Sequence, residues 1–470
     1  MEKRAHNLDA LRGFAILTMV LSGVIPYSTL PAWMYHAQVP PPTRIFDPSI
    51  PGITWVDLVF PFFLFALGAA LPIALNKRIE KGKLNFSLFT YILERTFLLG
   101  FFAIFSRHMR PYVINTGIFS TPHFSDWLWA ILGFALMFAI FLRLPKQIPN
   151  LYQHIVKYSG LLLAIALMFL IKYPDGTRFS PNRSDIIIVV LTNVYFFGSL
   201  AYLLTHDKLI FRIGIMGILA AFRLSHGLDG WTAAIWNFTP IPWMYKFSYL
   251  QYLMIVIPGT IAGDIILKWL KTSDNHEKSW TNNKYFSIAT LMVLFVVTLL
   301  VGLFTRAVWQ TVVSVMILGI IGNYLTKNPK SDNEQLIRKF FLWGIFFLVL
   351  GLVFEPYEGG IKKDHPTLSY YFVTSGLAGF LLILFTITLD VFKKQRSVQL
   401  LIDNGQNPMI AYVGYANFIW PVLALLHITP ILDKLDTINP WLGFGRGVLY
   451  TFLVALMVQF FTQKKLFWRT

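Results

Sequence analysis

The first residues whose types and spacing could do chemistry are His36 and Asp57, at the two ends of a proline-rich loop. The segment reads PAWMYHAQVPPPTRIFDPSIPGITWVD and leads into a long apolar run. An imidazole oriented by a carboxylate that stabilises its charged form is a recurrent general base. Two other interpretations stay open. A loop histidine is usually solvated, and an aspartate in the first turn of a helix is favoured by the helix dipole.

Charged and amide residues also lie near the ends of other apolar runs. Asp9 and Arg12 in NLDALRG are three residues apart, so on a helix they share a face and can pair. Arg95 in YILERTFLLG lies about two turns inside an apolar run, where a charge usually faces the interior of a bundle. Asn407 in DNGQNPMI begins another run. Each also has a structural interpretation. Asp9 and Arg12 would form a salt bridge at the lipid headgroups, Arg95 would extend its side chain to the headgroups, and Asn407 would cap a helix.

The segment FEPYEGGIKKDHPTLSYYF is a further charged loop beside an apolar run. Its charged and titratable residues are Glu355, Glu358, Lys362, Lys363, Asp364 and His365. A solvated loop explains most of this charge. The alternative is a polar substrate site, in which Glu358 and Lys363 contact the substrate.

The composition places all these residues in a membrane protein. Of 470 residues, 56% are hydrophobic and 13% are charged, about half the charge of a soluble domain. Apolar runs of about 20 residues, long enough to cross a bilayer, recur along the chain. We predict an all-α, polytopic integral membrane protein, a single domain over 1–470. We expect about fourteen spans, near 13–31, 55–75, 88–106, 125–143, 155–172, 184–204, 209–225, 247–268, 284–304, 308–326, 337–354, 368–391, 408–427 and 441–462.

The positive charges predict the orientation. Roughly twice as many Lys and Arg residues fall on the side that the termini share as on the other side, which indicates cytoplasmic termini. The loop that carries His36 then lies outside. The net charge of +17 is explained by this asymmetry and by contact with anionic membrane lipids, so no nucleic-acid partner is expected.

Arg12 and His36 cannot belong to one site. The helix between them would be about 36 Å long, whereas the hydrocarbon core is about 30 Å thick. A mechanism that uses both residues needs a substrate that reaches across the membrane.

Several chemistries are not expected. The chain has no cysteine, which excludes disulfides and thiolate catalysis. The ten histidines show no HExxH pattern and no close pairs, so we predict no metal site. No GxxxxGK[ST] loop occurs, which argues against ATP-driven pumping.

Five blocks in order carry a family resemblance. LDALRGFAIL, a histidine in the first exterior loop, and TWVDLVFPFFLFALG resemble the heparan-alpha-glucosaminide N-acetyltransferase family and its bacterial relatives. EGGIKKDHPTLSYYFVTSG, NPMIAYVGYANF and KKLFWRT resemble its later blocks. Enzymes of that family move acetyl groups from cytoplasmic acetyl-CoA to a terminal glucosamine across the membrane. The resemblance implies an acyltransferase in the inner (plasma) membrane of a bacterium.

The resemblance also implies roles for the residues above. His36 would be catalytic and Asp57 would orient it. His36 would deprotonate an amine or hydroxyl of a saccharide, or would first be acetylated itself. The headgroup of acetyl-CoA, the donor substrate, would lie at the cytoplasmic mouth, near the four residues Asp9, Arg12, Arg95 and Asn407.

The chain departs from the family pattern in several places. The link QVPPPTRIFDPSIP is extra, Ser22-Gly23 replaces an asparagine, the Gln-Arg pair of the fourth span is missing, and about four spans near 155–225 and 284–354 are additional. The sequence leaves open the acceptor, N- or O-acetylation, and whether the chain forms a homo-oligomer. A secondary transporter or lipid-linked glycan flippase is the alternative function. The lack of an internal repeat argues against it, as do the acidic residues, which cluster at span ends with Glu94 and Asp264 as the nearest exceptions. A third option is a receptor or assembly partner whose catalytic site has decayed, against which the intact His36 and Asp57 argue.

Overall fold

The computed structural model describes residues 4–26, 30–80, 86–115, 122–145, 147–272 and 279–470. Helices dominate these residues, and two isolated β-bridges occur beside them. In the first half the helices are α1 (His6–Val24), α2 (Trp55–Ile79), α3 (Phe86–His108), α4 (Pro111–Ile114), α5 (Phe124–Phe141), α6 (Asn150–Leu170), α7 (Ile186–Leu204), α8 (Leu209–Ser225), α9 (Trp231–Trp236) and α10 (Leu253–Lys271). In the second half they are α11 (Asn282–Phe304), α12 (Val308–Leu325), α13 (Asp332–Val353), α14 (Leu368–Thr386), α15 (Gln399–Gln406), α16 (Pro408–Gly414), α17 (Trp420–Leu425), α18 (Thr429–Ile438) and α19 (Pro440–Gln463). A helix satisfies its own backbone groups, which lipid requires.

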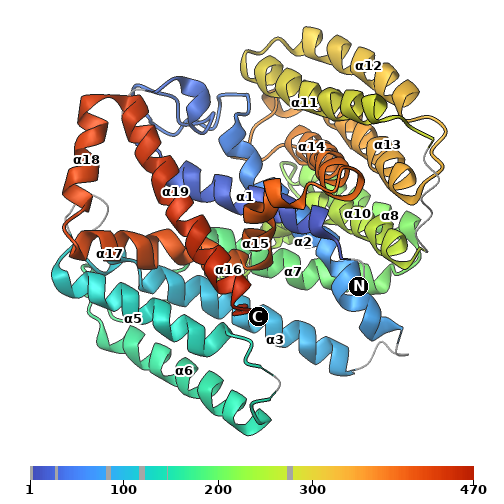
Figure 1. Ribbon diagram of the computed structural model, residues 1–470. Helices are drawn as coiled ribbons and strands as arrows, with labels where there is room; N and C mark the ends of the chain where they lie inside the picture. The colour runs from blue at the N-terminus through green and yellow to red at the C-terminus, as the bar shows by residue number, and fades with distance from the viewer. Residues whose placement is uncertain (1–3, 27–29, 81–85, 116–121, 146, 273–278) are drawn as a thin grey trace.

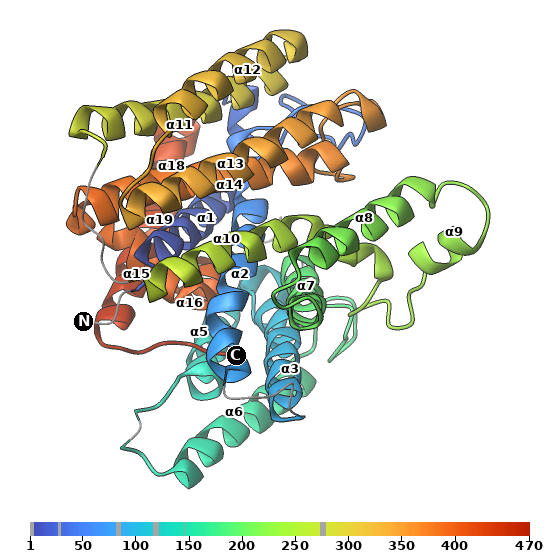
Figure 2. The same cartoon turned by 90° about the vertical axis from the view of Figure 1, so that its right-hand side faces the viewer.

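Thirteen helical segments of the described chain are long and apolar enough to cross a membrane. The prediction of many apolar spans is therefore confirmed, whereas the count of fourteen stays a prediction. The segment missing from the thirteen is α8, which has 17 residues. It nevertheless runs along α10 (Figure 2), with Arg212 bonded to Asp264 near its start and Arg223 bonded to Glu358 near its end. These contacts place the two ends of α8 far apart along the bundle.

The first span differs from its predicted bounds. α1 covers His6–Val24, whereas the apolar run predicts 13–31. The helix ends early because Pro26 disfavours helical geometry at the residue before it. It begins early because its polar first turns are buried against α15, where Gly13 and Gly405 let the two backbones meet.

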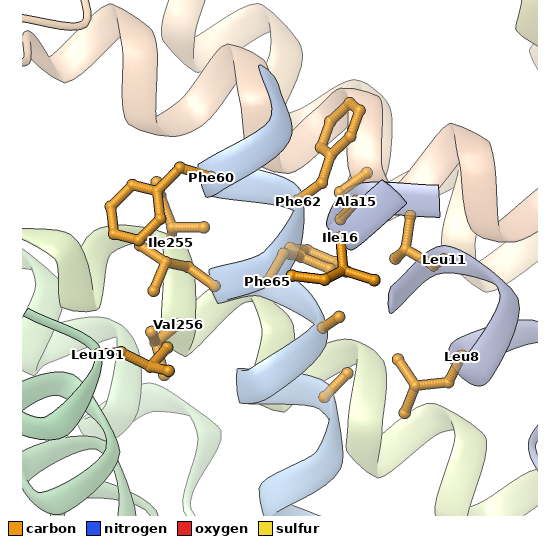
Figure 3. Close-up of a cluster of buried hydrophobic side chains, with 14 of the residues drawn as sticks. Leu8, Leu11, Ala15, Ile16, Phe60, Phe62, Phe65, Leu191, Ile255 and Val256 are labelled. Atoms are coloured by element: carbon orange, nitrogen blue, oxygen red, sulfur yellow. The ribbon is translucent and has the colours of Figure 1, made fainter. Parts of the chain in front are cut away.

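α1 and α2 form the centre of the bundle (Figure 1). α5 and α6 lie on one flank of this pair, and α11, α12 and α13 lie on another. Buried apolar side chains of α1, α2, α7 and α10 pack between the helices (Figure 3). Glycines bring α2 against α10, because a Cβ at Gly68 would overlap the carbonyl of Val256. This central packing fixes the two ends of the α1–α2 pair.

The two chain ends lie on one side of the bundle, because Arg4 and Thr470 line the same pocket. We call this the terminal side. The connection from α1 to α2, which includes the short helix η1 (Ala32–Met34), lies at the opposite ends of these helices, which we call the loop side. Arg12 and His36 therefore lie at opposite ends of the α1–α2 pair.

Candidate functional site

Asp57 is fixed in place by the start of α2. Thr54 is the N-cap residue, and Thr54 and Asp57 form a capping box. The Oδ2 atom of Asp57 accepts hydrogen bonds from the backbone N–H groups of Thr54, at 2.9 Å, and Ala37, at 3.2 Å. The side chain of Asp57 is 0% exposed. Asp57 thus begins a helix and still has its second oxygen, Oδ1, available for another partner.

That partner is His36, which lies between two carboxylates. Its Nδ1 atom is 2.8 Å from Oδ1 of Asp57, and its Nε2 atom is 2.6 Å from Oδ2 of Asp364. The Asp364 side chain is 39% exposed, so the two carboxylates differ in their access to solvent. Lys363 lies beside them, with Nζ 3.9 Å from Oδ1 of Asp57.

The two carboxylates favour a charged imidazole. Burial acts to lower the pKa of His36, but the hydrogen bonds to Asp364 and Asp57 outweigh it and raise the pKa above the ordinary 6.5. Burial acts to raise the pKa of Asp364, and the hydrogen bond from His36 with the charge of Lys363 lowers it instead. Both pKa shifts favour the charged pair, an imidazolium that donates to the Asp364 carboxylate.

Glu358, which we predicted to contact a substrate, holds structural elements together. It pairs with Arg223 of α8 at 2.8 Å and accepts the backbone N–H of Leu368, at the start of α14, at 2.8 Å. It therefore acts on the loop beside His36 rather than on His36. Lys363 is the residue of the predicted pair that lies at the histidine.

A pocket of about 550 Å³ opens on the terminal side between α1, α2, α3, α7, α16 and the C-terminal segment. We call it the arginine pocket. Its lining is strongly basic, and Asp9 is the acidic side chain in it. The six arginines that line it are Arg4, Arg12, Arg78, Arg95, Arg143 and Arg469. Such a lining suits a ligand that carries several negative charges.

Neutral groups and the carboxylate of Asp9 orient these arginines. Arg95 donates to the hydroxyl of Tyr91 at 3.1 Å and lies 5.0 Å from the ring centre of Tyr195. Arg12 donates to the carbonyl of Gly405 at 3.1 Å and lies 3.6 Å from Asp9. Burial, with repulsion from neighbouring arginines, lowers the pKa of Arg469 to about 10. The cations are thus close enough to repel one another, which an anion in the pocket would relieve.

Asn407 stands behind the pocket wall. Its side-chain nitrogen donates to the carbonyl of Leu466 at 2.8 Å, and its oxygen accepts the N–H of Trp468 at 3.0 Å. Asp9, Arg12 and Arg95 line the pocket. Asn407 instead positions the C-terminal segment that closes it.

A smaller apolar cavity of about 30 Å³ continues the arginine pocket toward the loop side. The two share the lining residues Phe63, Leu99, Leu191, Pro408 and Met409. Along α2, the lining reaches from Arg78 to Phe63, about 22 Å of helix, which leaves about 9 Å of helix to Asp57. The cavities therefore approach the histidine site from the far end of the same helix.

The sequence did not indicate Asp364 as a partner of His36, nor four of the six arginines of the pocket, Arg4, Arg78, Arg143 and Arg469. Asp364 stood among the charged residues of its loop, and only its neighbours Lys363 and Glu358 were assigned to a substrate. Arg78 and Arg469 resemble ordinary basic residues that flank a span on its cytoplasmic side. The tyrosines Tyr91 and Tyr195 were the remaining signal, since aromatic rings face both Arg78 and Arg95.

Two comparisons relate the chain to known proteins. Human heparan-alpha-glucosaminide N-acetyltransferase is 31% identical to it over 97 residues, 20% of this chain. The match spans 12% of the human protein, so the two share a limited segment. The model of the family DUF5009, a domain of unknown function, matches residues 4–266, more than half of the chain. The chain therefore belongs to the DUF5009 family.

Proposed function

We propose that the protein is a transmembrane acyltransferase, which moves an acetyl group from acetyl-CoA on the terminal side to an amino sugar or another saccharide on the loop side. The observation that carries the proposal is the pairing of two sites along α1 and α2. The arginine pocket lies at one end, and His36 lies between Asp57 and Asp364 at the other. The partial match to a human N-acetyltransferase supports the same reaction.

The donor's chemistry fits the arginine pocket. Acetyl-CoA carries several phosphate charges at one end, and guanidinium groups bind phosphates through paired N–H donors. A volume of about 550 Å³ lies within the usual range for small-molecule sites, about 300–1,000 Å³. The apolar cavity of about 30 Å³ that continues the pocket lies in the direction that the thioester arm would take, and it would have to widen to hold that arm. Arg12 and Arg95 would contact the phosphates, and Asn407 would act through Trp468.

At the loop side, His36 would act through Nε2, because Nδ1 faces the fully buried Asp57. The acceptor's N–H or O–H would give its proton to Nε2 as the acceptor atom attacks the thioester carbonyl carbon. The C–S bond would then break, and the leaving thiolate would take up a proton. In the two-step alternative, Nε2 itself takes the acetyl group and passes it to the acceptor. Lys363 would keep Asp57 ionised in either route.

The test is release of free CoA thiol by purified protein with acetyl-CoA and a panel of amino sugars and glycans. We expect release by the wild type. His36→Ala should bind acetyl-CoA as the wild type does and lose about 10²–10⁴-fold in rate. His154→Ala, which removes an exposed histidine of α6, is the matched control and should keep its rate. Equal release from wild type and His36→Ala would contradict the proposal.

The panel also separates the proposal from transport. A secondary transporter or glycan flippase would release no thiol with any acceptor. It would instead move a labelled saccharide or lipid-linked glycan across vesicle membranes, and a change at His36 would alter that movement.

A further inference from the structure

The two carboxylates on His36 are held very differently. Asp57 is enclosed and accepts hydrogen bonds from backbone groups on both sides of the loop, as described above. Asp364 is 39% exposed, and among the described residues its side chain makes one hydrogen bond, to Nε2 of His36. Asp57 is therefore a fixed partner of the ring, whereas the Asp364 carboxylate can turn away at the cost of that one bond.

The backbone around Asp364 is fixed while its side chain is not. Arg223 of α8 donates to the carbonyl of Pro366 and pairs with Glu358. Across the loop, the N–H of Thr367 donates to the carbonyl of Lys362 at 3.1 Å, and the N–H of Lys362 donates to the hydroxyl of Thr367 at 3.1 Å. The loop is closed on itself and tied to α8. A rotation of the Asp364 side chain is thus the smallest movement that frees Nε2.

In the described arrangement Nε2 cannot act on a substrate, since its proton is held by Asp364. A nucleophile or base needs a free lone pair at that nitrogen. An acceptor must therefore displace the Asp364 carboxylate. Displacement costs least when the acceptor offers the carboxylate a new hydrogen-bond donor, because that donor replaces the charged hydrogen bond to Nε2 that Asp364 gives up.

We propose that Asp364 is an acceptor-binding residue that exchanges the N–H of His36 for an O–H or N–H group of the acceptor, adjacent to the atom that becomes acetylated. This rests on the proposed acyl transfer. When no acceptor is bound, Asp364 occupies the hydrogen-bonding position at Nε2 of His36. When an acceptor binds, Asp364 selects it by accepting a hydrogen bond from the group next to the nucleophilic atom. A molecule with vicinal polar groups, such as a sugar, supplies both groups at once.

The proton balance of the exchange is simple. The Nε2–H bond of the imidazolium breaks, the electron pair stays on Nε2, and the proton leaves to water on the loop side. Asp364 remains an ionised carboxylate and accepts the acceptor's donor group. The acceptor's X–H then gives its proton to Nε2 as the X–C bond forms and the C–S bond breaks, and that proton goes to the thiolate. The sum is acceptor plus acetyl thioester to acetylated acceptor plus thiol.

The first test needs no substrate. Diethyl pyrocarbonate modifies histidine only through a free, neutral nitrogen, and peptide mass spectrometry can follow His36 among the other histidines. Asp364→Asn should be modified at His36 faster than the wild type and at lower pH. Asp47→Asn, which removes an exposed carboxylate of the same outer loop region bonded to Ser49, should match the wild type. The other titratable groups near His36 and its carboxylates are all unchanged in these variants: Lys363, His365, Tyr252, Tyr370 and Tyr371. Arg223 and Glu358, beyond Tyr371, are unchanged too.

The second test uses the acceptor that gives the fastest thiol release by the wild type. Asp364→Asn should raise the KM for that acceptor by about 10- to 100-fold, the effect of one charged hydrogen bond. It should also raise thiol release without any acceptor, while acetyl-CoA affinity stays unchanged and reports correct folding. Asp364→Glu, which keeps the carboxylate, should recover part of the acceptor affinity.

The outcomes separate the two proposals. If the wild type turns over and Asp364→Asn leaves both the acceptor KM and the acceptor-free release unchanged, the role of Asp364 is wrong and the acyl transfer stands. If diethyl pyrocarbonate modifies His36 in Asp364→Asn at the wild-type rate, the proposed role of Asp364 is also wrong. If the wild type releases no thiol with any acceptor, the acyl transfer fails and the role of Asp364 fails with it.

Discussion

The backbone N–H of Trp468 donates to the side-chain oxygen of Asn407 across 3.0 Å, and this contact fixes one wall of the arginine pocket. The nitrogen of the same side chain donates to the carbonyl of Leu466. The N–H of Arg469 donates to the carbonyl of Phe141 at 2.7 Å. The C-terminal segment is therefore tied at Leu466, Trp468 and Arg469, and the guanidinium of Arg469 lines the pocket because of these ties.

Removing the Asn407 amide should loosen that wall. Asn407→Ala leaves the buried N–H of Trp468 without a partner, which costs about 1–3 kcal/mol, and also removes the donor to the half-buried carbonyl of Leu466. We expect a lower free energy of unfolding and weaker acetyl-CoA binding, measured by thermal unfolding and by titration in detergent. Asn150→Ala, at an exposed position of α6, is the control. Equal stability of the two variants would show that the ties are dispensable.

Arg95 should contribute directly to donor binding. Arg95→Ala removes a charged hydrogen-bond donor from the pocket lining, and we expect acetyl-CoA to bind more weakly by about 1–3 kcal/mol. Arg396→Ala removes an exposed arginine between α14 and α15, outside the pocket lining, and should change affinity little. If both variants bind acetyl-CoA as the wild type does, Arg95 has a structural role only.

Local patterns made part of this architecture predictable. The apolar runs predicted most of the helices, because a span must be apolar over the bilayer thickness. The approach of His36 to Asp57 was also predictable, since one loop joins them and Asp57 enters α2 from the side on which that loop lies, while Thr54 with Asp57 forms a capping-box pattern. The two interpretations of Asp57, helix start and histidine partner, are both correct, because each uses a different carboxylate oxygen.

The remaining parts of the two sites depend on long-range packing, which local sequence patterns do not show. Asp364 lies 328 residues from His36 along the chain, and no periodicity connects two loops at such a distance. Arg78 and Arg469 belong to a general excess of positive charge, which sets orientation without showing which residues face inward. Asn407 has the residue type of a ligand contact, and its burial against Leu466 and Trp468 could not be read from its neighbours.

The charge of His36 predicts opposite pH trends for stability and activity. The pKa of His36 is raised by Asp364 and Asp57 against burial. Its contribution to stability is therefore fully present below the unfolded pKa of about 6.5 and is lost as pH rises through the folded pKa. Thiol release needs neutral Nε2, so it should rise over the same interval above pH 6.5.

The measurement is the difference in unfolding free energy between wild type and His36→Ala at several pH values, beside the rate of thiol release by the wild type. The stability difference should shrink as the rate grows. A stability difference that grows with pH would contradict a raised pKa for His36.

The orientation in the membrane can be tested with single cysteines, because the natural chain has none. Thr43 is exposed in the loop near His36, and Gln395 is exposed between α14 and α15. With cytoplasmic termini, Thr43→Cys should react with an impermeant thiol reagent in intact cells, and Gln395→Cys should react only after permeabilisation. The reverse pattern would place the arginine pocket outside, where acetyl-CoA is not supplied.

The contact of α1 with α15 should tolerate no added atom. A Cβ at Gly13 would overlap the carbonyl oxygen of Leu401, so Gly13→Ala must push the two helices apart. Overpacking of this kind costs about 1–3 kcal/mol. It should also weaken acetyl-CoA binding, because Arg12 is held in the pocket by the carbonyl of Gly405. At Gly214 of α8 a Cβ meets nothing within 4 Å, and alanine there should be neutral or stabilise the helix by up to about 1 kcal/mol. Thermal unfolding and acetyl-CoA titration of the two variants decide the matter, since equal behaviour would mean that α1 and α15 can separate without disturbing the pocket.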